Sequence, residues 1–222
     1  MERIRSALPD HEVVLVDAPG HGGSGGVDTD LSGAGRLLAD AGGRATYVGY
    51  SMGGRMVLHT ALERPATVER LVLVGATAGI DDPVERAERR TADDALAASI
   101  ERDGVAAFLD RWLANPMFAG LPDDPADRAE RLRNTASGLA SSLRSCGTAT
   151  QEPSWSRLGE LRMPVQVLAG ERDEKFVALG ERLARSIGEN ARFEIVRDAG
   201  HAAHLERPGE FTATLARFLG EM

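Results

Sequence analysis

The pentapeptide Gly-Tyr-Ser-Met-Gly at residues 49–53 is the feature that most constrains the fold of this chain. The β-branched run at residues 46–48 predicts a buried strand before it, and apolar spacing over residues 52–62 predicts a helix after it. Glycines two positions before and two after a serine permit the sharp strand-to-helix turn that presents the serine hydroxyl. Ser51 is therefore predicted to be a catalytic residue, and a plain glycine-rich turn is the alternative.

The rest of the chain alternates short apolar runs with amphipathic segments, which is typical of a doubly wound parallel sheet. The further runs that predict buried strands are residues 13–16, 71–74, 165–168 and 193–196. Amphipathic spacing predicts helices at residues 177–187 and 211–219. The predicted fold class is therefore α/β, with helices flanking a mostly parallel sheet.

A chain of 222 residues fits one medium domain and leaves no room for a second domain of full size. Residues 79–158 interrupt the alternation, because they have helical periodicity and no convincing strand. We expect this segment to form a helical cap over one end of the sheet. Residues 1–78 would then form the N-terminal part of the α/β core, and residues 159–222 its C-terminal part.

A catalytic serine on such a turn needs an acid and a histidine, which follow it in that order on loops after later strands. Asp173 follows the predicted strand at residues 165–168, and His201 follows the one at residues 193–196. His201 would take the proton of Ser51, and Asp173 would hold the imidazole in the required tautomer. A surface aspartate and a helix-capping histidine are the alternatives.

The composition excludes several other classes of protein. Acidic residues outnumber basic ones by 34 to 26, and the net charge of -8 argues against a general nucleic-acid or anionic-membrane binder. The single cysteine, Cys146, cannot form an internal disulfide and favours a reducing cytoplasm. No apolar run reaches the roughly 20 residues that span a bilayer, and residues 1–6 lack the apolar stretch of a signal peptide. We expect a cytoplasmic protein.

Two further patterns indicate ligand sites only weakly. His201 and His204 form a His-x-x-His pair, but without a third ligand they do not predict a metal site. The tract at residues 20–25 fits Gly-x-Gly-x-x-Gly, yet no strand ending in an acidic residue follows it at the distance a dinucleotide site requires. This tract is interpreted as a loop at the rim of the active site.

Three motifs together carry a resemblance to a known family. They are Asp-Ala-Pro-Gly-His-Gly-Gly-Ser at residues 17–24, the arginine Arg55 directly after the elbow glycines, and Gly-Glu-Arg-Asp-Glu-Lys-Phe at residues 170–176. The chain resembles the α/β-hydrolase superfamily, and within it the 2-succinyl-6-hydroxy-2,4-cyclohexadiene-1-carboxylate synthases of menaquinone biosynthesis. The resemblance implies a cofactor-independent lyase that eliminates pyruvate from 2-succinyl-5-enolpyruvyl-6-hydroxy-3-cyclohexene-1-carboxylate. In such a lyase Ser51 would act as a base, activated by His201 and Asp173.

The resemblance also implies which residues bind this small substrate with three carboxylates. Arg55, Arg89 and Arg133 would bind carboxylates, although Arg90 and Arg131 are close enough to replace the last two. Tyr50, Trp112 and Phe118 would form an aromatic wall, and the backbone N–H of Met52 would stabilise an oxyanion. An internal ion pair for Arg55, solvated faces for the cap arginines and packing within the cap for the two cap aromatics are the alternatives.

Other functions stay open at this point. The same triad would serve a hydrolase of carboxylic esters or of C–C bonds, and a truncated relative would act as a binding protein without catalysis. The family begins with about three strands before the one expected at residues 13–16, and residues 1–12 are too few to supply them. We therefore expect a slot about 9 to 10 Å wide between residues 13–16 and 46–48, and low solubility of the chain expressed alone. Direct pairing of these two strands is the alternative.

Overall fold

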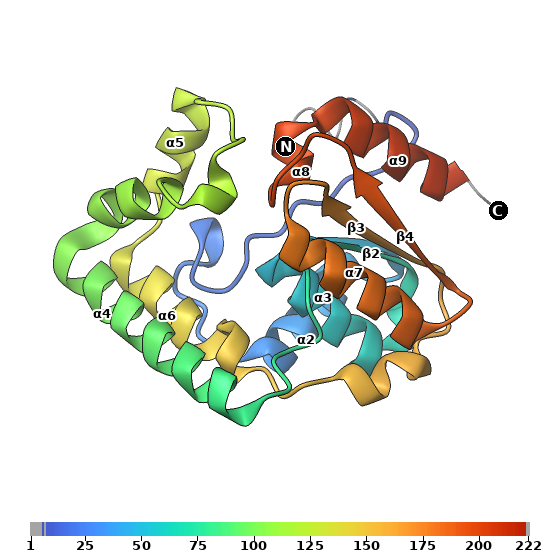
Figure 1. Cartoon of the computed structure of the whole chain (residues 1–222), viewed down its shortest axis with the longest axis horizontal. Coiled ribbons are helices and arrows are strands. Elements are labelled where there is room, and N and C mark those ends of the chain that lie inside the picture. The colour runs from blue at the N-terminus through green and yellow to red at the C-terminus, as the bar shows by residue number, and fades with distance from the viewer. Residues whose placement is uncertain (1–5, 7, 221–222) are drawn as a thin grey trace.

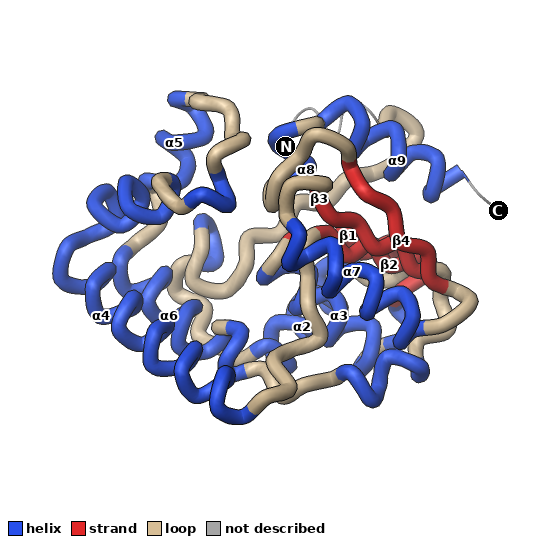
Figure 2. Tube along the Cα trace, in the orientation of Figure 1, coloured by secondary structure: helices blue, strands red, loops and turns tan. Residues whose placement is uncertain are grey.

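The computed structural model describes residue 6 and residues 8–220. Its described part contains one parallel sheet of four strands in the order β1-β2-β3-β4. The strands are β1 (Ala45–Tyr50), β2 (Val68–Val74), β3 (Val165–Gly170) and β4 (Ala191–Val196). Val48 pairs with Val72, and Leu73 with Val167, so the expected runs form adjacent strands (Figure 2).

Helices cover both faces of the sheet, which explains why β3 and the second half of β2 are buried and mostly apolar. On one face, Leu73 and Val167 pack with residues of α3 (Met52–Glu63) and α7 (Glu174–Ile187). On the other face, Val72 and Leu168 pack with residues of α9 (Pro208–Gly220). Helix α2 (Leu31–Gly42) lies against α3 (Figure 1). This arrangement confirms the expected α/β fold.

The chain between β2 and β3 is helical and contains no strand, and every residue of it is described. Its helices are α4 (Pro83–Leu113), α5 (Pro125–Leu132) and α6 (Ala136–Cys146), which gather beside the α/β core (Figure 1). Helix α4 is interrupted at Gly104, whose φ of 83° lies in the left-handed region that favours glycine. We call the three helices the cap.

Short helices complete the connections. They are η1 (Gly22–Ser24), η2 (Pro65–Thr67), η3 (Pro116–Phe118), η4 (Thr148–Thr150), η5 (Trp155–Glu160) and α8 (Ala203–Glu206). Among the helices of the described chain, none is both long enough and apolar enough to cross a membrane.

The prediction of a strand at residues 13–16 is wrong. These residues form no strand and take no part in the four-stranded sheet, and three of them are between 42% and 59% exposed. A β-branched run becomes a strand only where a neighbouring backbone completes its hydrogen bonds. Strand β1 is an edge strand of the described sheet, and its Val48 is 44% exposed. Residues 13–16 therefore do not pair with β1, and the width of the expected slot stays a prediction.

The buried middle of β2 provides a test of this packing. Leu73 is fully buried between the sheet and its helices, whereas Leu37 on α2 is 49% exposed. We expect Leu73→Ala to lower the free energy of unfolding by about 2 to 5 kcal/mol, because it leaves a cavity in the core. The same substitution at Leu37 should change it by less than about 1 kcal/mol. Urea unfolding measures both values, and equal losses would contradict the described packing.

Candidate active site

The turn between β1 and α3 holds Ser51 in a rare backbone conformation, with φ 50° and ψ −110°. A Cβ atom on Gly49 would collide with the carbonyl oxygen of Gly53, and one on Gly54 would lie 2.6 Å from the Cβ of Ala76. A Cβ atom on Gly53 would meet nothing within 4 Å. The sharp turn therefore depends on Gly49 and Gly54, and the second glycine of the motif is not sterically required.

The structure brings Ser51, His201 and Asp173 into one hydrogen-bonded line. His201 Nε2 lies 3.2 Å from Ser51 Oγ, and His201 Nδ1 lies 2.6 Å from Asp173 Oδ2. The three residues follow β1, β4 and β3, respectively, at the carboxyl edge of the sheet. An Nδ1–H that donates to Asp173 leaves Nε2 free to accept the proton of the Ser51 hydroxyl. The line can therefore move a proton away from Ser51 Oγ.

Aromatic rings enclose His201, which is only 3% exposed. The ring centroid of Phe176 lies 4.5 Å from that of His201, and those of Tyr50 and Phe118 lie 5.2 Å and 6.2 Å away. Trp112 extends this wall, with its centroid 5.6 Å from that of Phe118. Burial raises the pKa of Tyr50, so its hydroxyl stays protonated at neutral pH. These rings exclude water and so strengthen electrostatic interactions at the triad.

A cavity of about 800 Å³ opens onto Ser51 and is lined by residues of both the core and the cap. Its volume lies within the range of roughly 300 to 1,000 Å³ that is typical of small-molecule sites. The sequence-predicted residues that line it are Tyr50, Ser51, Met52, Arg55, Arg89, Trp112, Phe118 and His201. Met52 begins α3, and by this position its backbone N–H has no acceptor within the helix. This N–H can therefore serve an oxyanion.

The prediction for Arg133 is wrong, because the structure places this side chain on the surface. The side chain is 74% exposed and its Nη1 lies 2.9 Å from Glu130 Oε2. Arg131, two residues earlier, lines the cavity, and its Nε lies 2.6 Å from Asp127 Oδ2. A shift of two residues near the end of a helix turns a side chain by about 200°, so only one of the two arginines can point inward.

Arg55 is buried in the cavity wall, with only 6% of its surface exposed. It forms no ion pair within the described part of the chain, and its Nη1 has no hydrogen-bond partner there. Burial lowers the pKa of Arg55 to about 10, so the guanidinium is still charged at neutral pH. The internal ion pair considered from the sequence is therefore absent among the described residues. A buried unpaired cation is costly, which suits a site that binds an anion.

Arg89 of the cap lies in the same cavity and is held by an acidic residue that the sequence did not single out. Its Nε lies 2.7 Å from Asp93 Oδ1, and the Asp93 side chain is 5% exposed. The spacing of four residues on one helix was the available signal for this pair. Arg90, the alternative to Arg89, does not line the cavity and pairs with Asp94 at 3.4 Å.

His204 is partly buried against aromatic rings, and it does not belong to any group of metal-binding side chains among the described residues. Its ring centroid lies 4.5 Å from that of Tyr50 and 6.0 Å from that of Phe211. Burial lowers the pKa of His204 to about 4, so the ring is neutral at physiological pH. The glycine-rich loop at residues 20–25 lies at the rim, where its His21 lines the cavity.

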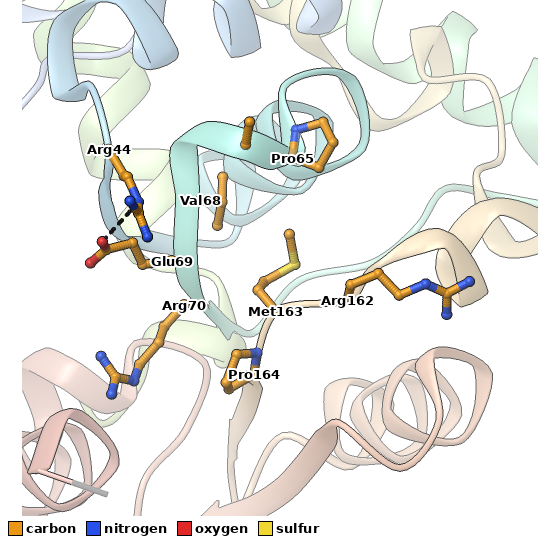
Figure 3. Close-up of a pocket in the computed structure, with 9 residues that line it drawn as sticks. Arg44, Pro65, Val68, Glu69, Arg70, Arg162, Met163 and Pro164 are labelled. Carbon is orange, nitrogen blue, oxygen red and sulfur yellow. Dashed lines mark ion pairs between the residues drawn. The ribbon is translucent and has the colours of Figure 1, made fainter. Parts of the chain in front are cut away.

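A second cavity of about 500 Å³ lies at the amino ends of the strands (Figure 3), and Ser51 is not among the residues that line it. None of its nine lining residues is a serine, cysteine or histidine. Its Arg44 already pairs with Glu69 at 3.0 Å. Ligands of open parallel sheets bind at the carboxyl ends of the strands, so the cavity at Ser51 is the candidate active site.

Comparison with known proteins agrees with this geometry. Residues 1–214 match the model of the alpha/beta hydrolase family. The chain therefore belongs to this family of enzymes.

Particular relatives are more informative than the family as a whole. A protein of Bacillus subtilis (strain 168), provisionally named 2-succinyl-6-hydroxy-2,4-cyclohexadiene-1-carboxylate synthase, is 36% identical over 96% of this chain and 82% of its own length. A protein of the same name from Escherichia coli O1:K1 / APEC is 32% identical, over 98% of this chain and 87% of its own length. The solved structure of MenH from S. aureus superposes with a TM-score of 0.88 at 31% identity, over 98% of this chain and 86% of that one.

The two glycines of the elbow motif provide a matched test of the turn. We expect Gly49→Ala to destabilise the protein by about 1 to 3 kcal/mol, because the new Cβ would collide with the carbonyl oxygen of Gly53. Gly53→Ala should be neutral or stabilising by up to about 1 kcal/mol, because Gly53 lies in α3 with open space around it. Thermal and urea unfolding compare the two variants, and equal destabilisation would contradict this account.

The buried His204 predicts how stability depends on acid. The pKa of this histidine is 6.5 in the unfolded chain and about 4 in the folded chain. As the pH falls below 6.5, the unfolded chain therefore takes up a proton at this residue while the folded chain does not. The free energy of unfolding therefore falls as the pH drops from 6.5 to 4, by at most about 3 kcal/mol. We expect His204→Phe to lose this part of the pH dependence between pH 7 and 4. The same change at the exposed His11 should leave it intact, and an unchanged slope in His204→Phe would contradict the prediction.

Proposed function

We propose that this protein is a 2-succinyl-6-hydroxy-2,4-cyclohexadiene-1-carboxylate synthase. It would be a lyase of menaquinone biosynthesis that eliminates pyruvate from 2-succinyl-5-enolpyruvyl-6-hydroxy-3-cyclohexene-1-carboxylate. The single observation that carries the proposal is the buried, unpaired guanidinium of Arg55, one helical turn after Ser51 in the same cavity. The names of the relatives support it as well.

The chemistry requires only a proton acceptor and a site for anions. Ser51 Oγ removes a proton from a ring carbon while His201 Nε2 accepts the proton of the hydroxyl. The electron pair of the broken C–H bond forms a new ring double bond, the existing ring double bond shifts by one position, and its electrons displace the C–O bond to the enolpyruvyl group. The enolate that leaves takes up a proton and becomes pyruvate. Since side chains perform each step, no cofactor is needed.

Two arginines from different parts of the chain support the binding of the substrate carboxylates. Arg55 comes from α3 of the core, and Arg89 comes from α4 of the cap. Arg131, which lines the same cavity, would bind a carboxylate in place of the exposed Arg133. A guanidinium can donate two parallel hydrogen bonds to a carboxylate, which holds the substrate in one orientation. In the proposed mechanism, the core and cap arginines hold the substrate above Ser51.

We further propose that the protein works in the cytoplasm. Cys146 is buried, and burial raises the pKa of its thiol to about 11, so it stays a neutral thiol. Disulfides are typical of oxidising compartments, and a single cysteine cannot form one within the chain.

The function is tested by measuring pyruvate release from the enolpyruvyl substrate with a coupled lactate dehydrogenase assay. Hydrolysis of a neutral ester, p-nitrophenyl butyrate, is measured beside it. We expect pyruvate release to exceed ester hydrolysis and to fall by about 100- to 10,000-fold in Ser51→Ala. Ester hydrolysis without pyruvate release would favour a hydrolase, and the absence of both activities would favour a binding protein.

The role of Arg55 makes a separate prediction. Arg55→Met keeps much of the side-chain volume but removes the charge, so we expect kcat/KM for pyruvate release to fall by about 10- to 100-fold. Arg36→Met is the control, because Arg36 lies on α2, is half exposed and is paired with Glu63 on the surface. If both variants keep the wild-type kcat/KM, Arg55 does not bind the substrate.

A further inference from the structure

Lys175 is the only lysine in a chain whose lysines and arginines together number 26. It lies in the first turn of α7, two residues after Asp173, which caps that helix. Its exposed side chain lines the cavity at Ser51, together with that of its neighbour Phe176. The proposed function assigns no role to this side chain.

The position of Lys175 is unfavourable for the stability of α7. The first turn of a helix carries a partial positive charge, so acidic residues are favoured there and cations are disfavoured. Acidic residues follow this rule in the first turns of several helices, with Glu85 in α4, Asp127 in α5 and Glu174 in α7 itself. Helix stability therefore gives no reason for a cation at residue 175.

Within the described residues, Lys175 forms no ion pair that would offset this cost. The arginine of the same loop, Arg172, pairs with Asp198 at 3.0 Å. On the same helix, Arg182 pairs with Asp81 and Arg185 with Glu181, at 2.6 Å and 3.4 Å. The ammonium of Lys175 is thus a positive charge without an ion pair to any described residue, at the wall of the candidate active site.

Lys175 and Arg55 belong to opposite ends of the catalytic line. The hydrogen bonds run from Ser51 through His201 to Asp173. Arg55 lies one helical turn after Ser51, and Lys175 lies two residues after Asp173. Arg55 is buried, whereas Lys175 is exposed. The two cations can therefore bind different carboxylates of one substrate.

We propose that Lys175 binds a carboxylate of the substrate at the open end of the cavity and so determines specificity for a polyanion. This inference rests on the proposed function, because it assigns one of the three carboxylates of that substrate. An ammonium is a compact charge on a flexible stem, which suits a group bound at the solvent-exposed side of a site. The remaining carboxylates are left to the arginines.

The first experiment uses the fact that Lys175 is the sole lysine. Acetic anhydride at low concentration acetylates Lys175 and the terminal amine of the chain, and mass spectrometry of the peptides measures both rates. The protein is the full chain with Ser51→Ala, which can bind the enolpyruvyl substrate without converting it. We expect saturating substrate to slow the acetylation of Lys175 by at least about 5-fold relative to the terminal amine. An unchanged rate at saturation, with binding verified by calorimetry, would overturn the proposal.

The second experiment compares Lys175→Met with Arg185→Met, a matched loss of one positive charge farther along α7. We expect Lys175→Met to raise KM for pyruvate release by about 10-fold while kcat stays within about 3-fold. Lys175→Arg should recover part of this loss, and Arg185→Met should match the wild type. Inactivation of Ser51 by phenylmethylsulfonyl fluoride, a neutral reagent, should proceed at the same rate in all four proteins.

The outcomes separate this inference from the proposed function. If the wild-type protein releases pyruvate and Lys175→Met keeps its KM, the role of Lys175 is rejected and the function stands. A slower reaction of Lys175→Met with the sulfonyl fluoride would also reject it, because the lysine would then act on the triad. If the wild-type protein releases no pyruvate, the proposed function itself is rejected, and the inference falls with it.

Discussion

The hydrogen bonds that join the four parallel strands are the constraint on which the whole site depends. They continue past the ends of the strands, where Ser51 N–H donates to the Val74 carbonyl at 2.8 Å and Gly75 N–H donates to the Leu168 carbonyl at 2.9 Å. Parallel strands end at one edge, so residues that follow different strands meet there. In this way Ser51 and His201, 150 positions apart in the chain, come within hydrogen-bond distance.

The site combines this edge of the sheet with a helical cap that contributes different side chains. The loops after the strands contribute the hydrogen-bonded line of Ser51, His201 and Asp173, which we call the proton-transfer line. The cap contributes Arg89, Arg131 and the ring of Trp112. Positive charge accumulates in the cavity even though the chain as a whole has a net charge of -8. Burial makes an unpaired cation such as Arg55 costly for the free protein. The same burial would strengthen its attraction for a carboxylate, which is the property that the proposed reaction requires.

Much of the core and of the proton-transfer line could be predicted from local patterns. The motif around Ser51 predicts the turn, and the order of the strands predicts that Asp173 and His201 join it. Two other predictions failed for reasons that local patterns do not contain. Residues 13–16 have the apolar character of a strand but no paired neighbour in the described sheet. Arg133 and Arg131 are equally plausible in sequence, and only the direction in which the chain leaves α5 separates them.

The sequence by itself determined the family, the sharp turn at Ser51 and the two residues that join Ser51 in a hydrogen-bonded line, because spacing along one chain encodes a strand, a turn and a helix. Tertiary structure decided which charges remain unpaired. Arg55 and Lys175 are without an ion pair in the described chain, whereas Arg172 pairs with Asp198 of a different loop. Helical spacing can indicate a local pair such as Arg89 with Asp93. A pair between elements depends on which carboxylates the packing of the chain brings within about 4 Å, and spacing along the sequence does not record that distance.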